Sequence, residues 1–213
     1  ILAMKDTHAF MFKFVAINIR LKSDRYPMPA LQHSKTLKTI NPIIDNGRIL
    51  ASNYVSIYLN EQDLSVIASM YDWDRAICTE CEKALKDFLP RWFTDYVYEC
   101  YRDKCALKFG DPVLYSIAKS RVNSLYGLTV QRSLQDDIIE VYDVGNYEIK
   151  PKENPRESYD KYINKRSSIL PYVYGVWVTS YAFVNIHKLI ECCDLPLYVD
   201  TDSCYGLRWN EDK

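Results

Sequence analysis

The chain has 213 residues, 48% of them hydrophobic and 26% charged, and its formal net charge at pH 7 is −1. This length and composition are ordinary for one or two globular domains and exclude a disordered tail. The balanced charge excludes a uniformly basic nucleic-acid binder, although a groove needs only local positive charge. No stretch reaches the roughly 18 consecutive apolar residues of a membrane span, and no signal-peptide pattern opens the chain. We therefore expect an intracellular protein without membrane contact and, since Ile1 is not a natural start, one cut from a longer chain.

The first part of the chain predicts two strands and a helix. Apolar residues alternate with others from Phe10 to Leu21, with a change of phase after Val15, which is typical of a strand that is bulged or buried on both faces. The polar, proline-containing stretch 26–42 is expected to form a surface loop, and residues 49–59 a second strand. Asn60 can then cap a short helix with an apolar stripe.

The middle of the chain predicts a helical hairpin. A helical stretch is expected to begin near Lys83 and to resume after an interruption at Pro90. Gly110 suits the position after a helix end, Asp111 suits an N-cap, and Pro112 suits the first position of a second helix.

The last third predicts an insertion, a helix and a strand. Residues 128–170 are rich in charge, and we interpret them as an inserted hairpin or loop. From Pro171 to Ile190 apolar residues recur at helical spacing, and this helix leads into a strand that ends near Asp200.

Seven cysteines, an odd number, make a disulfide scaffold improbable at this length, so reduced cysteines are expected. Cys78 and Cys81 have the spacing of half a zinc site, but Cys100 and Cys105 are a poor match for the second half.

Lys119, Asn123 and Tyr126 fall at i, i+4 and i+7 and therefore share one helix face. An ammonium can bind nucleotide phosphates, a tyrosine can pack on a base or sugar, and Gly127 permits close approach of the backbone. Taken singly, each side chain is more simply a solvated lysine, a capping asparagine or a half-buried tyrosine.

Asp200 and Asp202 lie two residues apart behind an apolar run, an arrangement that suits divalent cations. The spacing to Glu211 also matches an EF-hand calcium loop, but Cys204 replaces an oxygen ligand and Tyr205 replaces the glycine of its sharp turn. The remaining interpretation is a β-hairpin tip that presents carboxylates to metal ions.

These two motifs carry a resemblance to a known family. Residues 119–127 resemble motif B of family B DNA polymerases, and residues 198–203 resemble motif C, in the same order. Together with the strand 10–21, the two helices around Gly110 and the stretch 171–182, the resemblance covers nearly the whole chain. Within this family the chain is most similar to the protein-primed branch of phages, viruses and linear plasmids.

The resemblance implies an α+β fold that is part of a right-hand polymerase, with an antiparallel palm sheet and a helical-hairpin fingers subdomain. The expected segments are a palm segment with a surface insertion (1–82), helical fingers with motif B (83–127), an inserted hairpin or loop tied to processivity and strand displacement (128–170), and a palm helix with the motif C hairpin (171–213).

The resemblance also implies residue roles at the motif C hairpin. Asp202 would coordinate two catalytic Mg²⁺ ions, for which Mn²⁺ can substitute, and Asp200 would support the metal site. Tyr198, Thr201 and Ser203 would shape the hairpin and contact the DNA near the primer end.

At motif B, Lys119 would bind the triphosphate, and Asn123 and Tyr126 would line the nucleotide pocket. Lys104, or alternatively Lys108, would be a second phosphate-binding lysine of the fingers. The implied partners are primer-template DNA, deoxynucleoside triphosphates and a terminal protein primer, and the implied location is the cytoplasm of a host cell or an organelle.

The chain departs from the family pattern in several places. Motif A, an Asp-x-x-Ser-Leu-Tyr-Pro stretch with another metal-binding aspartate, is absent from the sequence and is expected before Ile1. Because a two-metal site needs the absent carboxylate, we expect the chain to be inactive alone. A thumb and an exonuclease domain are also missing. Leu128 stands where relatives often have lysine, and Phe183 where arginine is common.

Two other kinds of protein remain open. A non-catalytic nucleic-acid-binding module would explain local cations such as Arg102 and Arg121 but would not need the pair Asp200 and Asp202. A reverse transcriptase or RNA polymerase also uses paired aspartates, although it usually places them adjacently, and it fits the Lys119 motif poorly.

Overall fold

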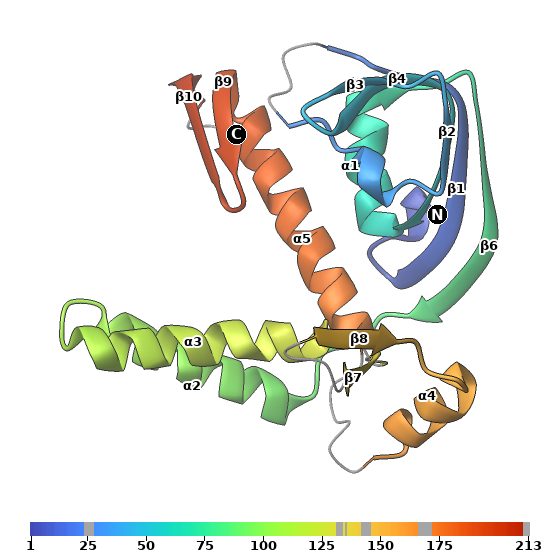
Figure 1. Ribbon diagram of the computed structural model, residues 1–213. Helices are drawn as coiled ribbons and strands as arrows, with labels where there is room; N and C mark the ends of the chain where they lie inside the picture. The colour runs from blue at the N-terminus through green and yellow to red at the C-terminus, as the bar shows by residue number, and fades with distance from the viewer. Residues whose placement is uncertain (24–27, 131–133, 135, 142–145, 166–171, 211–213) are drawn as a thin grey trace. The chain divides into compact units, whose positions relative to one another are not determined.

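The computed structural model of the chain describes residues 1–23, 28–130, 134, 136–141, 146–165 and 172–210 (Figure 1). They belong to two compact units, the first formed by Ile1–Phe88 with Trp177–Lys213 and the second by Leu89–Val176. Parts of the expectations above, at residues 26–27, 131–133, 135, 142–145, 166–170, Pro171 and 211–213, which include Glu211, lie outside the described residues.

The first unit is built on two long antiparallel strands, β1 (His8–Leu21) and β4 (Arg48–Asn60), as the sequence predicts. Together with four shorter partners they form a curled antiparallel sheet, which confirms the α+β fold class. The partners of β4 are β2 (Lys38–Ile40) and β3 (Ile43–Asp45), those of β1 are β5 (Tyr71–Asp72) and β6 (Arg75–Leu85), and two short 3-10 helices are η1 (Leu2–Met4) and η2 (His33–Lys35).

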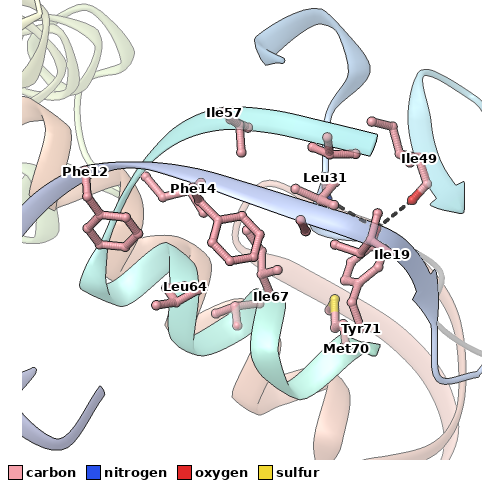
Figure 2. Close-up of a cluster of buried hydrophobic side chains, with 14 of the residues drawn as sticks. Phe12, Phe14, Ile19, Leu31, Ile49, Ile57, Leu64, Ile67, Met70 and Tyr71 are labelled. Carbon is pink, nitrogen blue, oxygen red and sulfur yellow. Dashed lines mark hydrogen bonds between the residues drawn. The ribbon is translucent and has the colours of Figure 1, made fainter. Parts of the chain in front are cut away.

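Alternation along β1 places its aromatic side chains in one hydrophobic core (Figure 2). Phe12 and Phe14 are buried, and the buried phase changes at Asn18, a residue with φ of 52°, so that Ile19 again faces inward. Tyr71 closes one end of this core, because its hydroxyl donates to the Ile49 carbonyl at 2.7 Å. Burial raises the pKa of Tyr71 to about 12, so its hydroxyl remains a donor at neutral pH.

Helix α1 (Glu61–Met70) follows β4 directly and lines the core with Leu64 and Ile67 (Figure 2). Asn60 is its N-cap, as expected, because the Asn60 Oδ1 atom accepts from the amides of Gln62 and Asp63 at 3.0 and 2.9 Å. Asn60 is itself buried, and its amide nitrogen donates to the Ser180 hydroxyl at 2.7 Å. The cap therefore also fixes a later segment of the chain.

We predict that Asn60→Ala lowers the free energy of unfolding by about 1–2 kcal/mol, because two helix amides and a buried hydroxyl each lose a partner. Urea unfolding followed by circular dichroism measures this loss. Asn154→Ala is the matched control, because Asn154 also occupies an N-cap but makes no capping hydrogen bond. Equal losses in the two variants would contradict the capping role.

The second unit contains the predicted helical hairpin, α2 (Arg91–Leu107) and α3 (Pro112–Thr129). The predicted insertion forms a β-hairpin of β7 (Asp137–Val141) and β8 (Asn146–Lys150), followed by a helix that the sequence analysis did not predict, α4 (Pro155–Ile163). Helix α5 (Tyr172–Glu191) begins in this unit and continues in the first, where it leads into the hairpin of β9 (Cys193–Asp200) and β10 (Ser203–Trp209).

Two expectations about local structure are wrong. The helix predicted from Lys83 does not begin there, because strand β6 continues to Leu85 by pairing with β1, and α2 starts only at Arg91. Strand β6 therefore crosses the predicted segment boundary at 82/83. The predicted surface loop 26–42 contains strand β2 and the buried side chain of Leu31, so it is partly integrated in the sheet and core.

The cysteines are free thiols, as expected. Cys78 and Cys81 are both exposed on β6, and within the described part of the chain no three cysteine, histidine or acidic side chains are grouped to hold a metal ion. None of the described helices is long and apolar enough to cross a membrane.

Candidate functional site

The two predicted metal-binding aspartates lie at the tip of the β9–β10 hairpin. Asp200 pairs with Ser203, which leaves Thr201 and Asp202 as a two-residue turn. The Thr201 hydroxyl donates to the Asp200 Oδ1 atom at 3.0 Å, and the Ser203 hydroxyl donates to the Asp200 carbonyl at 3.1 Å. Asp200 and Asp202 are both exposed, so the tip presents two carboxylates to solvent.

The turn holds a strained residue. Thr201 has φ of 47°, in the left-handed region that a β-branched side chain rarely adopts. Two-residue hairpin turns require this conformation, for which glycine and asparagine are the usual residues. The hairpin therefore keeps an unfavourable backbone conformation beside the carboxylates, which is a common property of functional sites.

The strands behind the tip are held by close packing at Gly206. A Cβ atom added there would lie 2.3 Å from the Cys193 sulfur and 2.8 Å from the Leu195 carbonyl oxygen. The register shifts between Tyr205 and Gly206, so the glycine lies where the ladder is irregular. This packing fixes the strands that carry the aspartates.

A tyrosine pair lies on the same face of the hairpin as Asp200. Tyr198 and Tyr205 are paired across the strands, with ring centroids 6.0 Å apart, and both rings are more than half exposed. Tyr198 was predicted to contact the primer end, whereas Tyr205 was considered only as a residue that excludes a calcium loop. The symmetry of the sequence about the turn is the signal that was missed, since Tyr198 lies two residues before Asp200 and Tyr205 two residues after Ser203.

The donor set at the tip fits a hard divalent cation. Mg²⁺ in proteins is typically bound by one or two carboxylates, with water and substrate phosphates as the remaining ligands. Asp200 and Asp202 supply two exposed carboxylates, and within the described residues no third acidic, cysteine or histidine side chain joins them. These two residues could hold the metal together with a bound triphosphate.

The predicted nucleotide-binding residues lie on α3 in the second unit. The helix starts as predicted, because the Asp111 Oδ1 atom accepts from the Val113 and Leu114 amides at 2.7 and 3.2 Å. At 100° per residue, Lys119, Asn123 and Tyr126 lie within about 60° of one another on the helix surface. All three side chains are exposed, and among the described residues Lys119 has no ion pair or hydrogen bond. We call these three residues the Lys119 face.

The two lysines predicted as alternatives for the second phosphate binder are Lys104 in α2 and Lys108 directly after it. The Lys104 ammonium lies 5.5 Å from the centre of the Tyr101 ring, and the Lys108 ammonium lies 5.5 Å from the centre of the Phe109 ring. Lys104 is half-buried and Lys108 exposed, but both are near an aromatic ring and neither is in an ion pair with another described residue.

The end of α3 is fixed by a close contact with the start of α5. A Cβ atom added at Gly175 would lie 2.4 Å from the Val130 side chain and 2.6 Å from the Thr129 hydroxyl. By contrast, apart from its own helix, a Cβ atom at Gly127 would have no described atom within 4 Å. Packing of the described residues therefore does not require a glycine at position 127.

A hollow of about 390 Å³ lies on another side of α3. Helical geometry places it roughly opposite the Lys119 face, so none of the predicted nucleotide-binding residues lines it. Its lining residues are Tyr96, Ser116, Ile117, Ser120, Arg121, Ser124, Leu125 and Leu128.

Comparisons with known proteins find similarity only at the level of structure. The sequence matches no known protein family, and no curated protein is similar to it. Solved structures of phi29 DNA polymerase match over 92% of this chain and 30–31% of theirs. They are an orthorhombic crystal form (TM-score 0.61, 18% identity), a ternary complex with primer-template DNA and incoming nucleotide substrates (0.59, 19%) and a post-translocation binary complex with primer-template DNA (0.58, 17%).

The chain thus spans less than a third of the length of the polymerase chains it matches. This structural likeness agrees with the resemblance of residues 119–127 and 198–203 to motifs B and C of that family. The chain has the fold of part of phi29 DNA polymerase, a protein-primed family B enzyme.

Proposed function

We propose that this chain is part of a DNA polymerase that transfers deoxynucleotides from their triphosphates to the 3′-hydroxyl of a primer on a DNA template. One combined observation supports the proposal: an exposed lysine, asparagine and tyrosine on the second helix of a helical hairpin, and exposed paired aspartates at a β-hairpin tip, occur within the fold shared with phi29 DNA polymerase. The matching polymerase complexes contain primer-template DNA and nucleotide substrates, which supports these as partners.

On the Lys119 face, the Lys119 ammonium, which has no ion pair with another described residue, would donate to the triphosphate oxygens of the incoming nucleotide. Tyr126 would pack against its base or sugar, and Asn123 would line the same pocket. Lys104 or Lys108 would supply a second cation to the phosphates.

At the hairpin tip, Asp202 and Asp200 would hold Mg²⁺ ions, or Mn²⁺ in their place. Bound metal ions of this kind stabilise the negative charge on the attacking 3′-oxygen and on the leaving pyrophosphate. The resemblance assigns a further metal-binding carboxylate to motif A, which this sequence lacks, so the complete site needs a carboxylate from outside these residues. Asp200 is oriented by the Thr201 hydroxyl at 3.0 Å, which leaves its other oxygen available.

The exposed Tyr198, with Thr201 and Ser203, would border the primer terminus. A tyrosine ring can pack against the terminal sugar or base. The Thr201 and Ser203 hydroxyls donate to Asp200 and would shape the tip beside the DNA. A terminal protein that provides the priming hydroxyl is part of the proposal because the resemblance is to the protein-primed branch.

The proposal is tested by template and sugar preference in a protein that contains these residues together with a motif A segment. We expect Mg²⁺-dependent extension of a DNA primer on a DNA template with deoxynucleotides, and at least about tenfold less with ribonucleotides or on an RNA template. A preference for RNA templates would indicate a reverse transcriptase, and a preference for ribonucleotides an RNA polymerase. DNA binding without any extension would indicate a non-catalytic binding module. Each of these three results would contradict the proposal.

A further inference from the structure

Glu61, the first residue of α1, carries a carboxylate that is completely buried in the first unit. Its Oε2 atom accepts from the Phe10 amide at 2.9 Å. Its Oε1 atom accepts from the Lys86 ammonium at 2.7 Å and from the Trp177 indole nitrogen at 2.9 Å. Disruption of this arrangement is costly, because removal of one partner leaves a buried charged or polar group without its hydrogen bond.

The electrostatics keep this carboxylate charged. Burial opposes ionisation, but the hydrogen bonds from Lys86, the Phe10 amide and Trp177 outweigh it, and the pKa of Glu61 is lowered. The pKa of Lys86 is raised, because its bonds to Glu61 and Tyr181 outweigh the effect of burial. The pair is therefore ionised at neutral pH.

Lys86 uses all three of its ammonium donors within the first unit. Besides Glu61, its nitrogen donates to the Lys5 carbonyl at 2.6 Å and to the Tyr181 hydroxyl at 2.9 Å. A lysine with three such bonds is fixed in position, so the backbone at residue 86 is fixed with it.

Besides the neighbouring Gln62, whose side-chain amide donates to Oε1 at 3.3 Å, the side-chain partners of Glu61 lie where the chain passes between the units. The chain leaves the first unit after Phe88, two residues beyond Lys86, and returns to it at Trp177. The departing segment at Lys86 and the returning segment at Trp177 therefore both donate to one carboxylate oxygen, Glu61 Oε1. We call these two segments the crossings.

We propose that Glu61 is a hinge clamp, a positioning residue that holds together the two segments by which the second unit is attached. Bonding both segments to one oxygen holds residues 86 and 177 at a fixed spacing within the first unit. The inference goes beyond nucleotide transfer and does not depend on it.

Hydrogen exchange measured by mass spectrometry on the whole chain tests the clamp. Glu61→Gln replaces one acceptor oxygen by an amide donor. This donor then faces another donor, either the Lys86 ammonium or the Phe10 amide, and one hydrogen bond is lost. We expect amides of residues 86–90 and 177–181 to exchange at least about tenfold faster, while those of 12–17 in β1 change less than about twofold. Glu80→Gln is the matched control, since Glu80 also binds a lysine in this unit, Lys13 at 3.1 Å, but on its exposed surface.

Two further variants separate a clamp from local support. Lys86→Met leaves the Glu61 charge without its counterion, so we expect faster exchange in 177–181 as well as in 86–90. Trp177→Phe keeps an aromatic ring but removes the indole donor, and it should accelerate amide exchange in both 86–90 and 177–181 to a smaller extent. The clamp is refuted if Lys86→Met accelerates exchange only in residues 86–90, or if Glu61→Gln accelerates exchange equally in β1 and in residues 86–90 and 177–181. Unchanged exchange of residues 86–90 and 177–181 in Glu61→Gln would refute it too.

Discussion

Asp202→Asn is expected to lower the rate of single-turnover primer extension at least about 10³-fold in a protein that also contains motif A. The asparagine keeps the size of the side chain but removes a charged oxygen ligand, and metal stabilisation of the transition state contributes several kcal/mol at about 1.4 kcal/mol per factor of ten. The affinity for primer-template DNA should change less than about threefold, since an exposed carboxylate does not neutralise phosphates. Rapid-quench kinetics and a separate DNA titration measure the two quantities.

Asp194→Asn is the matched control for this substitution. Asp194 is another exposed carboxylate of strand β9, six residues from Asp200 along the chain. We expect nearly unchanged extension. Asp200→Asn should cause a smaller loss than Asp202→Asn, because Asp200 supports the metal site. Comparable losses in the variants at 194 and 202 would show that charge on the hairpin, rather than a metal ligand at its tip, is what matters.

Lys119→Ala is expected to weaken nucleotide binding about 10- to 100-fold, with a much smaller change in kcat. A hydrogen bond between charged groups contributes about 1.5–3 kcal/mol, and among the described residues Lys119 has no other partner that its loss would disturb. The dependence of the extension rate on deoxynucleotide concentration measures this effect, because KM rises while kcat is largely retained.

Arg121→Ala provides the control for Lys119→Ala. Arg121 is an exposed cation on the same helix, but it lines the hollow on the other side of α3. We expect less than about a threefold change in KM. A similar effect of both substitutions would mean that α3 attracts nucleotides by its overall charge. Lys104→Ala and Lys108→Ala in the same assay would decide which of these lysines binds phosphate.

Local signals predicted much of the fold correctly. The alternation at Phe12 and Phe14 reflects a strand with one buried face, and the Asn60 cap and the Asp111-Pro112 start both act through neighbouring backbone amides. Such features depend on residues close in sequence, so periodicity and capping rules can identify them. The turn at Thr201 was located for the same reason.

One error arose where pairing between distant residues decides the structure. Residues 82–85 are good helix formers, yet they form strand because β6 pairs with β1 along its length. Helix α4 was missed although Asn154-Pro155 is a typical helix start, because the charge of the surrounding segment favoured a loop.

The candidate site was predicted unevenly for a related reason. The aspartates and the Lys119 face were found from their spacing, and the structure confirms that they are exposed on a hairpin tip and on one helix face. Glu61 could not be found in this way, because in the sequence it is an ordinary acidic residue in the first turn of a helix. Its importance depends on Lys86 and Trp177, which are brought to it only by the fold.

The proposed function assigns both the Lys119 face and the Asp202 hairpin tip to the incoming nucleotide. The most direct test is a double-mutant cycle on nucleotide affinity, with Lys119→Ala, Asp202→Asn and the double variant bound to a primer-template that cannot be extended, in the presence of Mg²⁺. If both side chains hold the same metal-bound triphosphate, the two losses will not multiply, and we predict a coupling of at least about fivefold, or roughly 1 kcal/mol. Losses that multiply fully, or an Asp202→Asn variant that binds nucleotide as tightly as the unmodified protein, would contradict a shared site.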